Sequence, residues 1–292
     1  MSRLFTHAGL ALMRLLQYLP LGLLARLGRG LGAMLYRLAH ERRGVVQTNL
    51  RLCFPELDEA ARERLAREHF AVFGRSFLER GFTFWASESK LRRLVRVHGL
   101  EHLQALAGQP VILFAPHFVC MDLGWARLSM EMPMAGIYSR QNNPVFDAAL
   151  QRARARFNSP VTLSRQDGAL RAARALREGR PFYYLPDLDY GPRDSIFVPF
   201  FGVQAATITG LSRLSRLSGA KVLSVVTRML PGAAGYVLEI GAPWSNWPGA
   251  SIEEDTRRMN ASLEIAVRAL PEQYYWLHKR FKTRPPGSPK LY

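Results

Sequence analysis

A histidine followed five positions later by an aspartate, His117 and Asp122, is the pattern in this 292-residue chain that best fits acid–base chemistry. His117 comes directly after the apolar run 111–115, so we expect it in the turn where a strand ends. If a helix begins just beyond that turn, Asp122 can accept a hydrogen bond from one ring nitrogen. The other nitrogen can then take a proton from a bound hydroxyl, as the base of a catalytic triad does. A chain with seven histidines also produces such spacings by chance, so a helix-capping histidine is the alternative interpretation.

Arginines near a second predicted turn could bind an anion. They are Arg152, Arg154, Arg156 and, further along the chain, Arg165. Arginines two positions apart do not share a face of a helix, so they do not form one stripe. At the end of a helix, some of them could reach a phosphate or a carboxylate, and a solvated helix end is the alternative.

Two aspartates and a tyrosine follow the apolar run 182–185, namely Asp187, Asp189 and Tyr190. Two carboxylates after a strand could hold a metal ion, but no third carboxylate or histidine is close in the sequence. We therefore predict no metal site and expect these residues to hold arginines or to bind sugar hydroxyls.

A cluster of aromatic and basic residues lies at 274–282. Aromatic rings beside arginines and lysines suit a membrane interface or stacking on nucleic acid. The sequence alone leaves both interpretations open.

The elements that must position these residues alternate along the chain. We predict strands at 111–115, 135–138, 161–163, 182–185, 221–227 and 236–240, with helices near 123–130, 145–157, 167–179, 205–217 and 252–270. Strands that alternate with helices of this length predict an α/β fold with a largely parallel or mixed sheet flanked by helices. In such a fold, functional residues lie at the carboxyl ends of strands.

Charge is the unusual feature of the composition. The 40 lysines and arginines exceed the 23 acidic residues, which gives a net charge of +17 and a pI near 10.7. A chain this basic is expected to meet polyanions such as anionic lipid, acidic proteins or phosphorylated substrates. With 48% hydrophobic residues the chain is globular rather than disordered. Its two cysteines exclude a disulfide framework.

The first 53 residues are both basic and apolar, and we treat 1–53 as a membrane-associating helical segment ahead of an α/β domain at 54–292. The longest charge-free run, Leu15 to Ala25, has 11 residues, against the roughly 20 needed to span a bilayer as a helix. Interleaved arginines favour a helix that lies in the membrane interface. The alternatives are a hairpin bent at Pro20 that packs on the body of the protein, or a tilted span.

Taken together, the ordered motifs are more specific than any one of them. They are His117-x4-Asp122, Tyr138 to Asn143-Pro144, Arg152-Ala153-Arg154-Ala155-Arg156, Pro186-Asp187-x-Asp189-Tyr190-Gly191, Phe197-Val198-Pro199-Phe200-Phe201-Gly202, Ala205-Ala206-Thr207 and Trp276-Leu277-His278-Lys279-Arg280-Phe281-Lys282. This series closely resembles the late acyltransferases of lipid A biosynthesis, the lauroyl/myristoyl transferases. The resemblance also takes in Arg42-Arg43, Asn49-Leu50 and Cys53-Phe54-Pro55-Glu56, so it covers nearly the whole chain.

The resemblance implies an acyltransferase with a glycerolipid-acyltransferase-like fold at the cytoplasmic face of the bacterial inner membrane. Such an enzyme moves a fatty acyl group from acyl carrier protein to a hydroxyl of a phosphorylated glycolipid acceptor. Its partners would be acyl carrier protein, that acceptor and anionic inner-membrane lipids, with no nucleic acid. Acyl carrier protein serves as a co-substrate, and no other cofactor is expected.

The resemblance also implies roles for single residues. His117 would be the general base and Asp122 its partner, although the family often has glutamate there. Arg154 matches a family arginine and would hold a phosphate or a sugar-borne anion, and Asp187 matches the first acid after the fourth strand. Ala153 departs from the family's usual glycine between the arginines.

Two alternative functions remain on the sequence alone. The His-x4-Asp spacing also occurs in glycerolipid acyltransferases, which acylate glycerol phosphate or lysophospholipids. The basic composition also allows a non-enzymatic protein that binds membranes or nucleic acid. However, no nucleic-acid-binding motif is found, and the basic ends of the chain are interleaved with leucine and phenylalanine.

Overall fold

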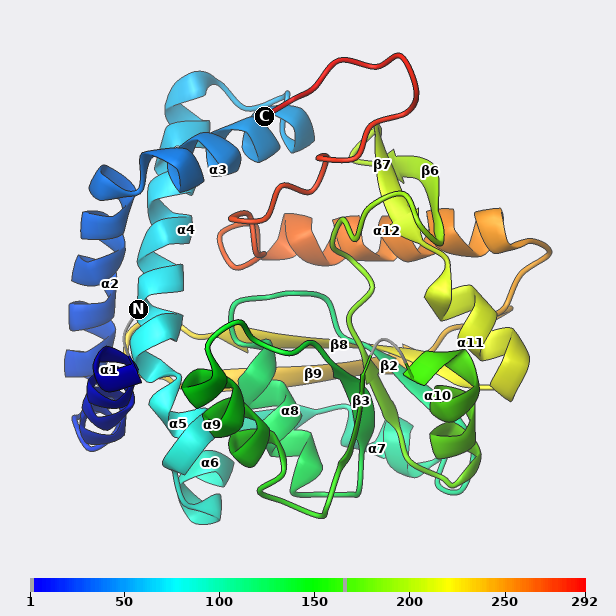
Figure 1. The fold of residues 1–292 in the computed structure, drawn as a ribbon, viewed down its shortest axis with the longest axis horizontal. Helices are drawn as coiled ribbons and strands as arrows, with labels where there is room; N and C mark the ends of the chain where they lie inside the picture. Colours follow the sequence, from blue (N-terminus) through cyan, green and yellow to red (C-terminus); the bar gives the residue numbers. More distant parts are fainter. Residues whose placement is uncertain (1–2, 165–166) are drawn as a thin grey trace.

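A computed structural model describes residues 3–164 and 167–292 of the chain (Figure 1). The helices are α1 (Arg3–Leu16), α2 (Leu21–Leu38), α3 (His40–Cys53), α4 (Glu59–Glu79), α5 (Gly81–Trp85), α6 (Glu88–Leu94), α7 (Leu100–Gln104), α8 (Met121–Ser129), α9 (Pro144–Arg154), α10 (Gly168–Arg177), α11 (Gly210–Ser218) and α12 (Ile252–Ala269). The strands are β1 (Val95–His98), β2 (Val111–Phe114), β3 (Ala135–Tyr138), β4 (Val161–Ser164), β5 (Phe182–Tyr184), β6 (Ser195–Phe200), β7 (Val203–Ile208), β8 (Lys221–Met229) and β9 (Tyr236–Pro243).

Seven of these strands form one mixed sheet in the order β1-β9-β8-β2-β5-β3-β4. Neighbouring strands are parallel except β8 and β9, which are antiparallel. Figure 1 shows α12 on one side of this sheet and α8 on the other. The predicted α/β fold with a largely parallel or mixed sheet is confirmed.

The sheet separates two hydrophobic cores because side chains alternate along each strand. In β2, Ile112 and Phe114 pack into the core that contains Leu263 of α12. The alternate residues, Val111 and Leu113, pack into the core that contains Trp125 of α8. An apolar residue at every position of β2 is therefore a consequence of burial on both faces.

The predicted start of the helix near 205–217 was wrong. The helix expected from residue 205 begins only at Gly210, because β6 and β7 form an antiparallel hairpin ahead of it. Its turn is Phe201-Gly202, and both residues have positive φ (50° and 74°). A two-residue turn with two positive φ angles matches the twist of a hairpin.

The N-terminal segment is helical, and α1, α2 and α3 all contact the rest of the protein, α2 most extensively. α2 lies along α4 in Figure 1, where the two helices are coloured blue and cyan. The buried side of α2 includes Gly28 and Gly32. A Cβ atom on Gly32 would lie 2.1 Å from the carbonyl oxygen of Phe70 in α4. Glycine is therefore required for the two backbones to approach this closely.

The other side of this segment carries exposed apolar side chains. They are Leu4, Phe5, Leu12, Leu15, Tyr18, Leu23, Leu27, Met34 and Leu38, each at least 43% exposed. None of the described helices combines the length and the apolar character needed to cross a bilayer. The boundary between a segment at 1–53 and a domain at 54–292 stays a prediction.

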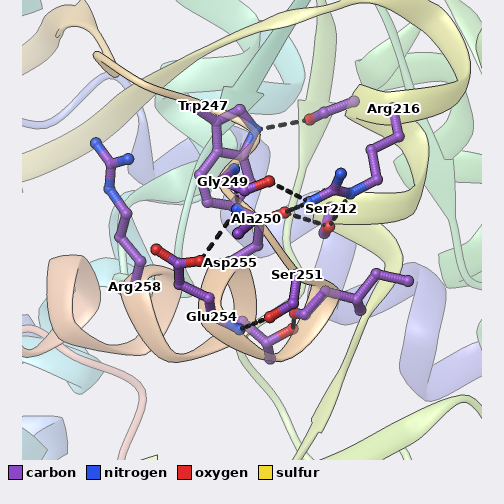
Figure 2. Close-up of polar contacts among 12 residues, drawn as sticks. Ser212, Arg216, Trp247, Gly249, Ala250, Ser251, Glu254, Asp255 and Arg258 are labelled. Carbon is purple, nitrogen blue, oxygen red and sulfur yellow. Dashed lines mark hydrogen bonds and ion pairs between the residues drawn. The ribbon is translucent and has the colours of Figure 1, made fainter.

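Polar contacts fasten the start of α12 to α11 (Figure 2). Asp255, which is 1% exposed, accepts hydrogen bonds from Ser212 Oγ at 2.5 Å and from the backbone N–H of Gly249 at 2.6 Å. Arg216 Nη2 lies 2.8 Å from the same carboxylate. Ser251 caps the first turn of α12. These contacts fix the helix that leads into the last part of the chain.

Candidate active site

Two neighbouring parallel strands bring His117 and Asp187 together. β2 and β5 pair with Phe114 opposite Tyr184, and each of the two polar residues lies three positions beyond its strand. Because the carboxyl ends of parallel strands meet at one edge of a sheet, the two side chains arrive at the same place. Asp187 Oδ1 lies 2.7 Å from His117 Nδ1, and Asp187 Oδ2 accepts the backbone N–H of His117 at 2.9 Å.

The hydrogen bond expected between His117 and Asp122 was therefore wrong. Asp122 lies in the first turn of α8, and its Oδ1 is 3.1 Å from Nη2 of Arg154 at the end of α9. The Nδ1 side of the ring is already occupied by Asp187. Asp187, which is 70 positions further along the chain, is the partner instead, because its carboxylate binds both the backbone and the ring of His117.

Both carboxylates of the site are ionised. Burial raises the pKa of Asp187, but the positive charge that the His117 ring carries when it is protonated and the hydrogen bonds from His117 outweigh burial, so that the pKa lies below its ordinary value. Burial also raises the pKa of Asp122, and the charges of Arg154 and Arg80 outweigh it. Two arginines therefore act on the carboxylate of Asp122.

Within residues 3–164 and 167–292, the Nε2 atom of His117 has no hydrogen-bond partner. A neutral ring that donates Nδ1–H to a carboxylate keeps its lone pair on Nε2. The His117 side chain is 14% exposed, so it can be reached from outside. The pair can therefore take a proton from a hydroxyl and stabilise the imidazolium that forms.

Two small cavities adjoin Asp122. The larger, of about 20 Å³, lies between Asp122, Arg154 and the side chains of Trp125 and Leu185. The smaller, of about 10 Å³, lies beside Arg80. A cavity of either size has room for about one water molecule, so neither holds a fatty acyl chain unless it widens.

Arg156, a predicted substrate-binding residue, contacts the backbone instead. Its Nη1 donates to the carbonyl oxygen of Thr83 at 2.8 Å, and its Nη2 donates to that of Ala86. It therefore fastens the end of α5. Arg165 lies outside the described residues.

The carboxylate oxygens of Asp189 already accept hydrogen bonds from other residues of the chain, so the expected role of Asp189 in binding a sugar was wrong. It is 3% exposed, and its oxygens accept from the N–H and Oγ1 of Thr283 at 2.6 and 2.8 Å. It also accepts the backbone N–H of Gly191 at 2.9 Å. The hydroxyl of Tyr190 donates to the carbonyl oxygen of Leu185 at 2.9 Å.

Cys120 lies next to the site, but it is unsuited to act as a nucleophile. It is 4% exposed, and burial raises the pKa of its thiol well above the ordinary value. Within the described residues, no three histidine, cysteine or carboxylate side chains converge where they could hold a metal ion.

The aromatic cluster at 274–282 belongs to the interior, so its interpretation as a membrane or nucleic-acid surface was wrong. Tyr274, Trp276 and Phe281 are at most 1% exposed. The backbone N–H of Tyr275 donates to the carbonyl oxygen of His117 at 2.9 Å. Its place in the ordered series of motifs was the one sequence signal of a link to the site.

Comparisons with known proteins show which family the chain resembles. Residues 1–283 match the family described as "Bacterial lipid A biosynthesis acyltransferase". The chain is 37% identical to the lipid A biosynthesis lauroyltransferase of Escherichia coli (strain K12), and the match covers 98% of this chain and 94% of that protein. It is 34% identical to the lipid A biosynthesis palmitoleoyltransferase of the same organism, and that match also covers 98% of this chain and 94% of that protein.

Among solved structures, a 1-acyl-sn-glycerophosphate acyltransferase from Thermotoga maritima aligns with 85% of this chain and 97% of its own. The sequence identity is 18% and the TM-score is 0.39. A likeness at that level supports no argument, so a glycerolipid-acyltransferase-like fold stays a prediction.

Proposed function

The chain belongs to the bacterial lipid A biosynthesis acyltransferase family, and from that premise we propose that it moves a fatty acyl group from acyl carrier protein to a hydroxyl of a phosphorylated glycolipid. It is an acyltransferase of late lipid A acylation. Relatives named for lauroyl and palmitoleoyl transfer are similarly close to it, so the length of the acyl group is left open.

The observation that carries the mechanism is the His117–Asp187 pair, in which Asp187 binds Nδ1 and leaves Nε2 as the basic nitrogen of a side chain that is 14% exposed. Nε2 takes the proton from the acceptor hydroxyl as its oxygen attacks the thioester carbonyl. The tetrahedral intermediate then collapses, the carbon–sulfur bond breaks, and the departing thiolate takes the proton back from the imidazolium. Asp187 stabilises the imidazolium between the two steps. A thioester is already activated, so no covalent acyl-enzyme is required.

Arg154 is the residue that would bind the phosphate of the acceptor. Its Nη2 contacts Asp122, but its Nε is buried with no hydrogen-bond partner among the described residues. A buried N–H without a partner costs free energy, which an anionic oxygen could recover. Asp122 would then hold the guanidinium in place rather than orient His117.

The exposed apolar side of α1 and α2 would lie in the interface of the inner membrane at its cytoplasmic face. The support is the combination of exposed leucines with arginines at Arg14 and Arg26 on the same helices. Such helices bury apolar side chains below the headgroups while cations meet anionic lipid. The net charge of +17 suits both that surface and an acidic carrier protein.

The test is an acyl-transfer assay that offers acyl carrier protein thioester with three acceptors side by side: a lipid A precursor, glycerol 3-phosphate and a lysophospholipid. We expect transfer to the lipid A precursor alone, and loss of transfer in His117→Ala. The matched control is His98→Ala, which changes an exposed histidine on β1. Preference for a glycerolipid acceptor would overturn the acceptor assignment, and turnover by His117→Ala would overturn the mechanism.

A further inference from the structure

The part of the chain that follows α12 pairs with the loop that carries His117. We call residues 273–283 the C-terminal segment. Figure 1 shows it in orange and red, running from the end of α12 past α4 toward β6 and β7. The backbone N–H of Tyr275 donates to the carbonyl oxygen of His117, and that of Val119 donates to the carbonyl oxygen of Gln273, both at 2.9 Å.

The same segment also holds the turn that carries Asp187. The backbone N–H of Asp189 donates to Nε2 of His278 at 3.0 Å. The side chain of Asp189 accepts two hydrogen bonds from Thr283. The hydroxyl of Tyr274 lies 3.4 Å from the carbonyl oxygen of Asp187. One stretch of chain therefore contacts the backbone on both sides of the proposed catalytic pair.

His278 must be neutral to make its contact. Burial, followed by the charge of Arg280, lowers the pKa of His278 to about 4. At neutral pH the ring is therefore neutral, and its proton lies on Nδ1 because Nε2 accepts the N–H of Asp189. A protonated ring could not accept that N–H. Asp189, Asp187 and His117 are the other charged or titratable groups whose charges act on this ring.

The segment is itself anchored on both sides of His278. Asn49 Nδ2 donates to the carbonyl oxygens of Trp276 and His278, each at 2.8 Å, and Asn49 is fully buried. Arg280 Nη1 donates to the carbonyl oxygen of Ala206 at 2.9 Å, and Arg280 is 1% exposed. Because the chain around His278 is fixed by these contacts, His278 holds the backbone N–H of Asp189 in place and does not move with it.

We propose that His278 is a positioning residue: it fixes the amide of Asp189, two residues beyond Asp187, and so keeps the Asp187 carboxylate aligned with His117. The inference rests on the proposed roles of His117 and Asp187. In this role His278, a partly buried and neutral histidine, acts through Asp187 without contact with substrate. Small displacements of a catalytic group are costly, since a shift of about 1 Å can lower a rate about 100-fold.

The first test compares His278→Leu with His278→Gln in the full-length protein. Leucine removes the acceptor, whereas the amide oxygen of glutamine can accept the Asp189 N–H. We expect kcat to fall about 10- to 100-fold in His278→Leu with KM for both substrates within about twofold, and His278→Gln to recover to within about fivefold of wild type. His98→Leu, which changes an exposed histidine on β1, is the control. If His278→Gln is as slow as His278→Leu, or if neither variant loses activity, the proposal is overturned.

A double-mutant cycle separates positioning from a general loss of stability. If His278 acts through Asp187, adding His278→Leu to Asp187→Asn should lower kcat by less than about threefold further. An undiminished effect in that background would show that His278 acts independently. Turnover by His117→Ala would instead remove the proposed mechanism itself, so the two failures are distinguishable.

Discussion

Replacing each of the two candidate carboxylates by its amide tests which one orients His117. Asp187 uses its two oxygens to accept two N–H groups, the backbone N–H and the Nδ1–H of His117. Asparagine keeps the size and shape but offers one oxygen and one NH₂ group. One donor of His117 must then face another donor, or the ring must move its proton to Nε2. In the second case Nε2 is no longer a base.

The magnitude follows from these contacts. Losing a hydrogen bond to a charged group costs about 1.5–3 kcal/mol, and a donor left facing a donor adds about 1–3 kcal/mol. The sum corresponds to a rate loss of about 10² to 10⁴. We expect kcat of Asp187→Asn to fall about 10³-fold. The comparable aspartate-to-asparagine change in a serine protease costs about 10⁴.

Asp122→Asn is the matched comparison. Asp122 pairs with Arg154 at 3.1 Å, with side-chain exposures of 17% and 19%. A pair that solvent partly screens is worth about 1 kcal/mol, which corresponds to about a fivefold change. We therefore expect a loss of at most about tenfold in Asp122→Asn.

The assay is steady-state acyl transfer at saturating thioester and lipid A precursor, with circular dichroism and thermal unfolding to confirm that each variant is folded. The reasoning is refuted if Asp122→Asn loses about 10³-fold while Asp187→Asn stays within about tenfold of wild type. That result would restore the partner first expected from the spacing along the chain.

Two further predictions concern stability and membrane binding. Burial lowers the pKa of His69 to about 4, so between pH 6.5 and pH 4 the unfolded chain binds a proton that the folded protein does not bind. The contribution of neutral His69 to the free energy of unfolding is therefore fully present above pH 6.5 and is lost as the pH falls toward 4. Between pH 7 and pH 5 the loss is about 2 kcal/mol, and urea unfolding should show that slope in wild type and its absence in His69→Gln. Changing Phe5, Leu12 and Leu15 to serine together, each at least 56% exposed, should weaken flotation with anionic vesicles about 100-fold, whereas Leu170→Ser on α10, 76% exposed, should not. Equal flotation of both variants would contradict membrane docking through α1.

Local patterns predicted the repeating elements of the sheet. The strands predicted at 111–115 and 182–185 are present as β2 and β5, each one residue shorter, and the helices between them are present. Local patterns succeed here because burial imposes its period on consecutive residues. The β6–β7 hairpin was missed because Phe-rich strands joined by a two-residue turn were indistinguishable from a loop followed by a helix.

The site was predicted in part. His117 and Asp187 were both identified from their places after predicted strands, and the resemblance to a family matched both. Its contact with His117 was not predicted, because the two residues are 70 positions apart and meet only since β5 lies beside β2. The aromatic cluster at 274–282 has the composition of a surface element, yet it is buried against the loop that it holds.

The sequence by itself determined which residues could do chemistry, where the strands end and how basic the chain is, because those features depend on residue type and near neighbours. Only the tertiary structure decided that Asp187 rather than Asp122 contacts His117 and that His278 holds the turn beside them. The physical reason is that the order of the strands and the path of the C-terminal segment bring these groups together. Their separation along the chain does not indicate their distance in space.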